Sequence, residues 1–345
     1  MKRRQGNPPD PVTIIDVAHK AGVSYATVSR VINNEDYVKP ATRERVMLAI
    51  NDLGYVANRQ ARSLRGGRTN TIGLLVRDLG TGYIGEIARG IDAELANREY
   101  DLMLYTTHGR ELKESTYVQT LARGMVDGLL LVLPRNPENY LKSLEQRHFP
   151  HVLIDPQSVE ETGPSVSATN YQGAYAATKY LIELGHRRIG LISGPLTMRC
   201  VHERLEGYRA ALLDHQIGLN PAWISEGDFF QPSGFAGAHQ LLTLAVPPTA
   251  ILAANDVMAL GVMEAVRDQG LRIPEDISII GFDDIPQAAS VHPALTTVRQ
   301  PLEEMGRVAV QLLFEYIENP ELPACYKVLP TRLCIRGSCQ PPSAP

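Results

Sequence analysis

The spacing of apolar residues changes near residue 68 and divides the chain into two parts. Before that point, apolar residues recur every three or four positions, which predicts helices over Ile14–Ala21, roughly Tyr25–Ile32 and about Thr42 to Leu53. After it, short apolar runs alternate with amphipathic segments of 10–16 residues, which predicts strands alternating with helices. The first part is therefore expected to be all-α and the second α/β.

The α/β part contains too many strand–helix units for one parallel sheet. We therefore expect two lobes, with a boundary near Thr169 and Asn170. The predicted strands are Ile72–Val76, Leu102–Tyr105, Gly128–Leu133, His151–Ile154, Ile189–Ile192, Ala250–Ala253 and Ile277–Phe282. The predicted helices include Ile84–Arg98, Tyr175–Leu184, Arg204–His215 and Met258–Gln269.

The three short helices of the first part have the order of a helix-turn-helix domain. Thr13 and Ser24 are placed to cap the first two helices, and Gly22 can adopt the positive φ that ends the first. On the second helix, Val28 and Ile32 are expected to face the core. The opposite side carries Tyr25, Ala26, Ser29 and Arg30. These residue types suit a major groove, since arginine can donate two hydrogen bonds to guanine and alanine can contact a thymine methyl group.

Charge is distributed unevenly along the chain, although the net charge is only −4. Residues 1–68 contain twelve Lys/Arg and six Asp/Glu, a net +6, whereas the remaining residues contain 22 and 32, a net −10. A basic head on an acidic body is expected when one end of a protein meets phosphates.

Targeting and membrane segments are not expected. Met1–Arg4 is basic, but a polar stretch with prolines follows it instead of the apolar core of a signal peptide. No run approaches the roughly 18 apolar residues of a membrane span. The cysteines (Cys200, Cys325, Cys334 and Cys339) are scattered without a C-x-x-C pair, which indicates free thiols in a reducing cytoplasm.

Enzyme motifs are weak or missing. Gly80–Gly85 reads G-x-G-x-x-G, but three residues separate it from the preceding strand, and no carboxylate for a ribose follows the next strand. His148 and His151 lie across a proline-broken loop without a nearby cysteine or acidic set. No G-x-S-x-G elbow, P-loop or cysteine–histidine motif occurs. We therefore expect no enzymatic activity, no metal and no cofactor.

Distinctive short motifs occur along almost the whole chain. In the first part they are Val12–Ala18, Ala21–Ser24, Thr27–Asn33, Thr42–Val46, Leu53–Tyr55, Asn58–Arg59, Ala61–Leu64 and Ile72–Leu74. In the second part they are Val126–Gly128, Leu184–Ile189, Gly194–Pro195, Arg204–Tyr208, Ala254–Asp256, Gly281–Asp284 and Leu295–Val298. These motifs resemble those of the LacI/GalR (lac repressor) family of bacterial transcriptional regulators, and those of the first part match nearly without gaps.

This resemblance implies an all-α helix-turn-helix headpiece and an α/β periplasmic-binding-protein-like two-lobed effector domain. The implied headpiece is residues 1–56, the hinge helix and linker 57–69, and the effector-binding and dimerisation domain 70–345. Its N-lobe would comprise about 70–169 and 299–329, and its C-lobe about 170–298 and 330–345.

The resemblance also assigns DNA contacts. It assigns base reading to Tyr25, Ala26 and Arg30. It assigns phosphate contacts or docking to Thr13, Ser24, Thr27, Ser29, Asn33 and Thr42.

The implied hinge helix is Asn58–Leu64, with Asn58, Arg59, Ala61 and Leu64 as DNA contacts. In the family this segment orders on the operator and inserts a leucine, here Leu64, into the minor groove. The segment is too polar to fold alone, which agrees with ordering on DNA.

The effector residues implied by the resemblance are Tyr83, Asp155, Arg204, Phe229, Asn255 and Asp283. An arginine, an amide and a carboxylate suit a polyhydroxyl molecule, because each can hydrogen-bond two adjacent hydroxyl groups. Met198 and Cys200 replace residues with which purine-responsive relatives hold a base. The resemblance therefore favours a mono- or disaccharide as the effector.

Several polar residues also have structural interpretations. Asp256 is expected to be the N-cap of the following helix, and Asp155 to brace the passage between the lobes. His186 follows a helix-ending glycine and is expected at the surface or in a cap. Thr169 stands where many relatives have an aspartate.

The function expected from these observations is a cytoplasmic homodimer that binds a palindromic double-stranded operator. It would repress carbohydrate uptake or catabolism genes until a sugar inducer releases it. Residues 340–345 contain no leucine heptad, so the tetramer-forming tail of the lac repressor is not expected. Two alternatives remain open: a regulator that needs a non-sugar co-repressor, and a cytoplasmic solute-binding protein that does not contact DNA.

Overall fold

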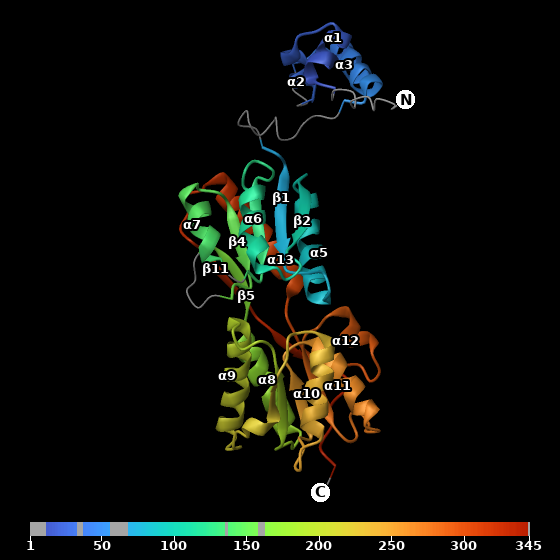
Figure 1. Cartoon of the computed structure of the whole chain (residues 1–345), viewed down its shortest axis with the longest axis vertical. Helices are drawn as coiled ribbons and strands as arrows, with labels where there is room; N and C mark the ends of the chain where they lie inside the picture. The colour runs from blue at the N-terminus through green and yellow to red at the C-terminus, as the bar shows by residue number, and fades with distance from the viewer. Residues whose placement is uncertain (1–11, 33–36, 56–67, 135–136, 158–162, 344–345) are drawn as a thin grey trace, which may run out of the picture. The chain divides into compact units, whose positions relative to one another are not determined.

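The computed structural model describes residues 12–32, 37–55, 68–134, 137–157 and 163–343 (Figure 1). The chain forms two compact units, one ending at Gly67 and the other beginning at Arg68. Each unit has its own apolar core, so each is described separately. None of the helices in the described ranges has both the length and the apolar character that a bilayer crossing requires.

The first unit, which we call the headpiece, contains three helices: α1 (Ile14–Ala21), α2 (Tyr25–Ile32) and α3 (Pro40–Leu53). Thr13 and Asp16 form a capping box at the start of α1, and Gly22 ends it with φ 63°. The third helix begins two residues before the predicted start, because Pro40 is well tolerated in the first turn. Val28 is buried as predicted, but Val31 is more deeply buried than Ile32.

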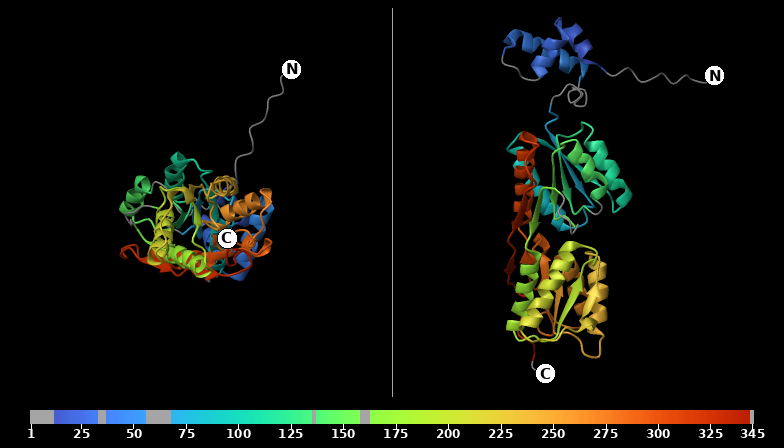
Figure 2. Two further views of the ribbon diagram at one scale, coloured as in Figure 1. Left: turned by 90° about the horizontal axis from the view of Figure 1, so that it is seen from below. Right: turned by 90° about the vertical axis from the view of Figure 1, so that its left-hand side faces the viewer.

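The second unit contains two six-stranded sheets, each covered by helices on both faces (Figures 1 and 2). The first sheet, in the order β11-β5-β4-β3-β1-β2, is parallel throughout and forms the N-lobe. Its strands are β1 (Thr71–Val76), β2 (Asp101–Thr106), β3 (Gly128–Val132), β4 (His151–Ile154), β5 (Ser165–Ala168) and β11 (Tyr326–Leu329). Helices α5 (Gly82–Ala96) and α13 (Leu302–Glu318) pack on one face, and α6 (Glu111–Leu121) and α7 (Glu138–Gln146) on the other.

The second sheet, in the order β12-β10-β9-β8-β6-β7, forms the C-lobe. Its strands are β6 (Ile189–Ser193), β7 (Ile224–Glu226), β8 (Ala250–Ala253), β9 (Ser278–Asp283), β10 (Thr296–Arg299) and β12 (Arg332–Cys334). Only β12 runs antiparallel to its neighbour in this sheet. Helices α8 (Asn170–Glu183) and α9 (Arg199–Asp214) cover one face, and α10 (Gln231–Leu242) and α11 (Asp256–Asp268) the other. The short helices are η1 (Pro221–Trp223) and α12 (Pro286–Ser290).

The chain passes between the lobes after β5, after β10 and after β11. Two of these passages are joined where Thr331 donates its backbone N–H to Thr169 Oγ1 (2.8 Å) and its hydroxyl to the Thr169 carbonyl (3.0 Å). The expected fold class, an all-α unit followed by a two-lobed α/β unit, is confirmed.

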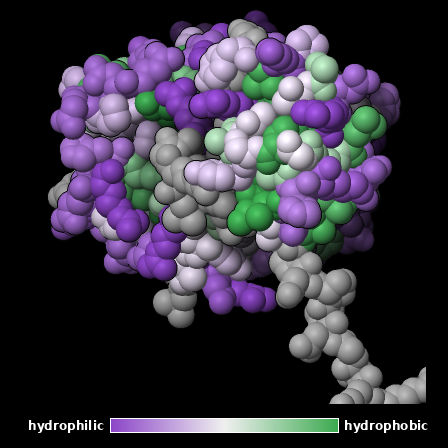
Figure 3. All heavy atoms as spheres, turned by 90° about the horizontal axis from the view of Figure 1, so that it is seen from above, coloured by the Kyte–Doolittle hydropathy of each residue, from purple (hydrophilic) through white to green (hydrophobic). Residues whose placement is uncertain are grey.

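Most of the large apolar side chains are buried in the lobe and headpiece cores. The exposed ones are distributed over both units, and the face drawn in Figure 3 shows apolar areas within a largely hydrophilic surface. Single exposed apolar residues are normal for folded proteins and indicate no specific site.

Candidate functional site

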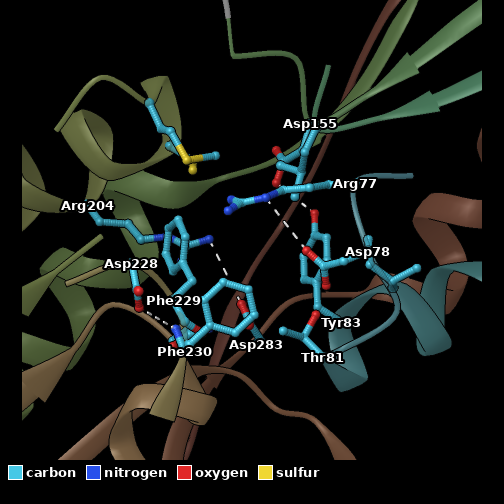
Figure 4. Close-up of a pocket in the computed structure, with 15 residues that line it drawn as sticks. Arg77, Asp78, Thr81, Tyr83, Asp155, Arg204, Asp228, Phe229, Phe230 and Asp283 are labelled. Atoms are coloured by element: carbon cyan, nitrogen blue, oxygen red, sulfur yellow. Dashed lines mark hydrogen bonds and ion pairs between the residues drawn. The ribbon is translucent and has the colours of Figure 1, made fainter. Parts of the chain in front are cut away.

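A cavity lies between the two lobes at the carboxyl ends of their parallel strands (Figure 4). The empty space in it, including the part that is open to solvent at the mouth, is about 670 Å³. All six residues predicted to bind an effector line it: Tyr83, Asp155, Arg204, Phe229, Asn255 and Asp283. Clefts at this position in α/β folds are the usual place for small ligands.

The N-lobe contributes a buried tyrosine–carboxylate pair to the cavity. Tyr83, in the first turn of α5, donates its hydroxyl to Asp155 Oδ2 over 2.8 Å, and Asp155 follows β4. Burial raises the pKa of Asp155. The pKa of Tyr83 is also raised, by burial and by the nearby Asp155 carboxylate. Asp155 therefore lines the cavity and is held there by the Tyr83 hydroxyl.

The C-lobe contributes an arginine that is held in place from several sides. Arg204 donates Nε–H to Asn170 Oδ1 (2.9 Å) and an η-amino group to the Ala254 carbonyl. Its guanidinium lies 3.8 Å from the centre of the Phe282 ring. The other η-nitrogen lies 4.0 Å from Asp283 Oδ1, so the protein itself orients the cation toward that carboxylate.

Asp283 ends β9 with φ 113°, a conformation that L-residues rarely adopt. Gln300 Nε2 donates a hydrogen bond to its Oδ1 over 2.7 Å. Burial raises the pKa of Asp283 to about 7, although Arg204 and Gln300 act in the opposite direction. The carboxyl group therefore changes protonation near neutral pH.

Four of the ten non-glycine residues with positive φ in the described ranges line the cavity. Leu133, Asp155, Phe229 and Asp283 all line it and all have positive φ values. Such conformations persist only where the surrounding structure enforces them, and they are typical of ligand sites.

The predicted N-cap of α11 was wrong by one residue. Asn255, not Asp256, caps the helix, because its Oδ1 accepts the Met258 N–H over 2.9 Å. Asp256 is the first helical residue and is fully buried, where it accepts hydrogen bonds from the Ile285 N–H (2.9 Å) and the Thr297 hydroxyl (2.5 Å). A cap must have non-helical backbone angles, which only the folded chain shows.

Asn255 also fixes the aromatic residue of the cavity. Its Nδ2 donates to the Phe229 carbonyl over 3.0 Å, and Phe229 has φ 73°. The Phe229 ring packs against Gly194, where an added Cβ would lie 2.4 Å from the ring Cζ. Only glycine leaves room for the ring in this orientation.

Met198 and Cys200 line the same cavity, and with Val201 they form an apolar cluster that Leu133 and Phe229 join. Burial raises the pKa of the Cys200 thiol to about 12, so the thiol is neutral at physiological pH.

Several other residues at the cavity were not predicted from the sequence to bind an effector. Arg77 and Asp78 follow β1, and the Arg77 guanidinium lies 5.7 Å from the centre of the Phe230 ring across the mouth. Asp228 and Thr81 also line the cavity. These residues lie in loops without periodicity, so only folding brings them together.

His186 is buried, which corrects the expectation of a surface position. Its ring nitrogens lie 2.8 Å from Thr249 Oγ1 and 3.0 Å from the Gln340 carbonyl, so the side chain anchors the C-terminal segment to the C-lobe. Its pKa is lowered by burial.

Within the described ranges, no group of three or more His, Cys, Asp or Glu side chains is arranged to hold a metal ion. In the G-x-G-x-x-G segment, Gly82 begins α5 and approaches Ile285 of the C-lobe. Gly82 therefore serves close packing between the lobes.

The headpiece presents a basic groove. Its lining includes Ser24, Thr27, Arg30, Tyr37, Lys39, Thr42 and Arg45. Ser24 Oγ lies 2.9 Å from Thr27 Oγ1 and accepts the Thr27 N–H over 3.2 Å, so it caps α2 as predicted. Tyr37, Lys39 and Arg45 are additions that the sequence pattern did not indicate.

The other predicted DNA contacts have different surroundings. Tyr25 and Arg30 are exposed on α2, while Ala26 and Ser29 are half-buried. Thr13 uses its side chain in the capping box. Asn33, Asn58, Arg59, Ala61 and Leu64, with most of the predicted hinge helix and linker, lie outside the described residues.

Comparisons with known proteins cover both units. The family described as "Bacterial regulatory proteins, lacI family" matches residues 13–58, and the "Periplasmic binding protein-like domain" matches residues 178–339. The HTH-type transcriptional repressor CytR of Escherichia coli (strain K12) is 38% identical over 327 residues, covering 94% of this chain and 96% of the relative.

Two solved structures are similar over almost the whole chain. The lac repressor dimer bound to operator and the anti-inducer ONPF has a TM-score of 0.82 and 31% identity, covering 96% of this chain and 100% of that one. The complex of the transcriptional regulator CelR with cellobiose has a TM-score of 0.71 and 36% identity, covering 95% of this chain and 99% of that one.

Proposed function

The chain belongs to the lacI family of bacterial regulatory proteins, and we propose that it represses carbohydrate uptake or catabolism genes until a sugar inducer releases it from its operator. As a member of this family it is a DNA-binding transcriptional regulator. The proposal adds the class of genes, the class of effector and the direction of the response. It also includes a cytoplasmic homodimer on a palindromic site, since each subunit carries one headpiece.

The observation that carries the effector proposal is the arrangement of Arg204, Asp283 and Phe229 around one cavity. The guanidinium and the carboxylate are held 4.0 Å apart, a spacing that suits adjacent hydroxyl groups on one ring. The fixed Phe229 ring offers an apolar face to the C–H side of a sugar. The CelR complex, whose bound cellobiose is a sugar, supports the same effector class.

Operator release by sugars tests this proposal. The operator is first selected from random duplex DNA with the full-length protein, and its affinity is then measured by fluorescence anisotropy with and without ribose, cellobiose and other mono- and disaccharides. An inducer should weaken operator binding about 5- to 150-fold, the usual range of allosteric coupling. Tighter binding would indicate a co-repressor, and no change with any sugar would reject the sugar effector.

Replacement of Arg30 tests base reading by α2. Arg30→Ala should cost about 1–3 kcal/mol of operator affinity and relax the preference for one base pair in each half-site. Arg45→Ala is the matched control, because this cation lies in the same groove but on α3. We expect Arg45→Ala to reduce the slope of log affinity against log salt concentration by about one, without changing the base preference. The same uniform effect from Arg30→Ala would make Arg30 a phosphate contact.

A further inference from the structure

Tyr37 lies beside Arg30 in the basic groove of the headpiece, just before α3. The Arg30 guanidinium carbon is 5.6 Å from the centre of the Tyr37 ring, within the range of a cation–π contact. The tyrosine is 72% exposed, so burial in the core does not account for its position.

The segment that carries Tyr37 is anchored to the headpiece core. Val38, the next residue, packs against the buried apolar cluster of the three helices. Arg43 of α3 donates a hydrogen bond to the Val31 carbonyl of α2 over 3.4 Å, which ties the two helices together. The Tyr37 ring and the end of α2 are therefore held in a defined relation.

An exposed arginine needs such support to read a base. Its long side chain samples many rotamers, and ordering it for a bidentate contact with a base edge costs conformational entropy. A ring within cation–π distance of the guanidinium limits the orientations of that group while leaving its N–H groups available at the edge. Lys39 and Arg45, which line the same groove, are cations and cannot supply this support.

We propose that Tyr37 is a positioning residue for base recognition, whose ring holds the Arg30 guanidinium in the orientation that reads one base pair per half-site. The inference rests on the proposed function, in which Arg30 contacts a base. The inference adds Tyr37 as a residue that makes the contact between Arg30 and the base specific, although Tyr37 itself does not touch the base. A direct contact of the Tyr37 hydroxyl with a phosphate is the competing role.

The test uses full-length protein and the selected operator, together with an operator changed at the base pair whose preference Arg30→Ala relaxes. Tyr37→Leu should reduce discrimination between these two DNAs about two- to fivefold, the size of an exposed cation–π contact. The salt dependence should not change, because no cation is removed. Tyr37→Phe keeps the ring and should behave like the original protein.

A double-mutant cycle separates positioning from an independent contact. In the Arg30→Ala background, Tyr37→Leu should cause no further loss of discrimination. An equal loss in both backgrounds would overturn the inference. A loss of affinity for both DNAs that Tyr37→Phe shares with Tyr37→Leu would also overturn it, because it would show a contact made by the hydroxyl. If Arg30→Ala leaves the base preference unchanged, Arg30 does not read a base. That result would reject the proposed base reading itself, and it differs from the results that reject only the role of Tyr37.

Thermal unfolding monitors the structural effect of each variant. If Tyr37→Leu lowers the melting temperature of the headpiece, Tyr37→Asn, which suits a turn, replaces it in the same cycle. Discrimination that stays unchanged in the stable variant would overturn the proposal.

Discussion

Removal of residues 1–67 is expected to abolish operator binding and to leave the affinity for the effector unchanged. The removed part contains the helix-turn-helix unit and its basic groove. The remaining residues contain 23 Lys/Arg and 32 Asp/Glu, an acidic balance that repels DNA. The truncated chain keeps both lobes and the whole lining of the cavity. Gel shift with the selected operator and calorimetric titration with the inducer measure the two effects.

The truncated protein should also unfold cooperatively, because its cores are formed within residues 68–345. The control is full-length Arg45→Ala, which should bind the operator more weakly, most clearly at low salt, but still bind it. Operator binding by the truncated chain would contradict a DNA-binding role confined to the headpiece. Failure of the full-length protein to bind any selected duplex would instead favour a solute-binding protein.

The strands that the sequence predicted are those whose own residues are mostly apolar. Ile72–Val76 and Ala250–Ala253 lie within or coincide with β1 and β8, which are buried along their whole length. The pattern did not indicate β5, with the sequence Ser-Val-Ser-Ala, or β12, with Arg-Leu-Cys. These segments are short and partly polar, and they become strands because β4, β11 and β10 supply hydrogen-bond partners. Tertiary pairing of this kind has no local sequence pattern.

The cavity residues that could be predicted are those that lie in the family motifs. The family motifs placed Arg204, Asn255 and Asp283 together, and the structure gathers them around one cavity. The partner of Asp283, Gln300, comes from the passage after β10 and belonged to no motif. Asn255 caps α11 in place of the predicted Asp256, because the backbone angles decide which residue precedes the first turn. A sequence pattern does not locate the start of a helix to within one residue.

Replacement of Asp283 is expected to have the largest effect on the effector response. Asp283→Asn should weaken sugar binding by about 1.5–3 kcal/mol, because a hydrogen bond to a charged acceptor is lost. That loss corresponds to a factor of roughly 10 to 150, and operator release should then need correspondingly more sugar. Calorimetric titration of the inducer and operator release by fluorescence anisotropy measure both.

The pKa of about 7 adds an effect of pH on sugar affinity. The ionised carboxylate accepts hydroxyl hydrogen bonds, whereas below pH 7 the group must first lose its proton. Sugar affinity should therefore fall by up to about tenfold per pH unit below 7, and this dependence should be reduced in Asp283→Asn. A pH-independent affinity between 5.5 and 8 would contradict the role of the ionised carboxylate.

The same substitution should stabilise the ligand-free protein at neutral and alkaline pH. The folded pKa of about 7 lies above the ordinary 3.8, so the folded protein retains a proton that the unfolded chain releases. The free energy of unfolding therefore falls as pH rises from about 4 to 7, and the loss persists above 7. Asparagine carries no charge and removes this cost, so Asp283→Asn should melt at a higher temperature than the original protein at pH 8. Asp268→Asn, at an exposed carboxylate of α11 outside the cavity lining, is the control and should change sugar binding and melting little. A lower melting temperature for Asp283→Asn at pH 8, or sugar binding equal to that of the original protein, would show that Asp283 is a structural residue and not the carboxylate that binds the effector.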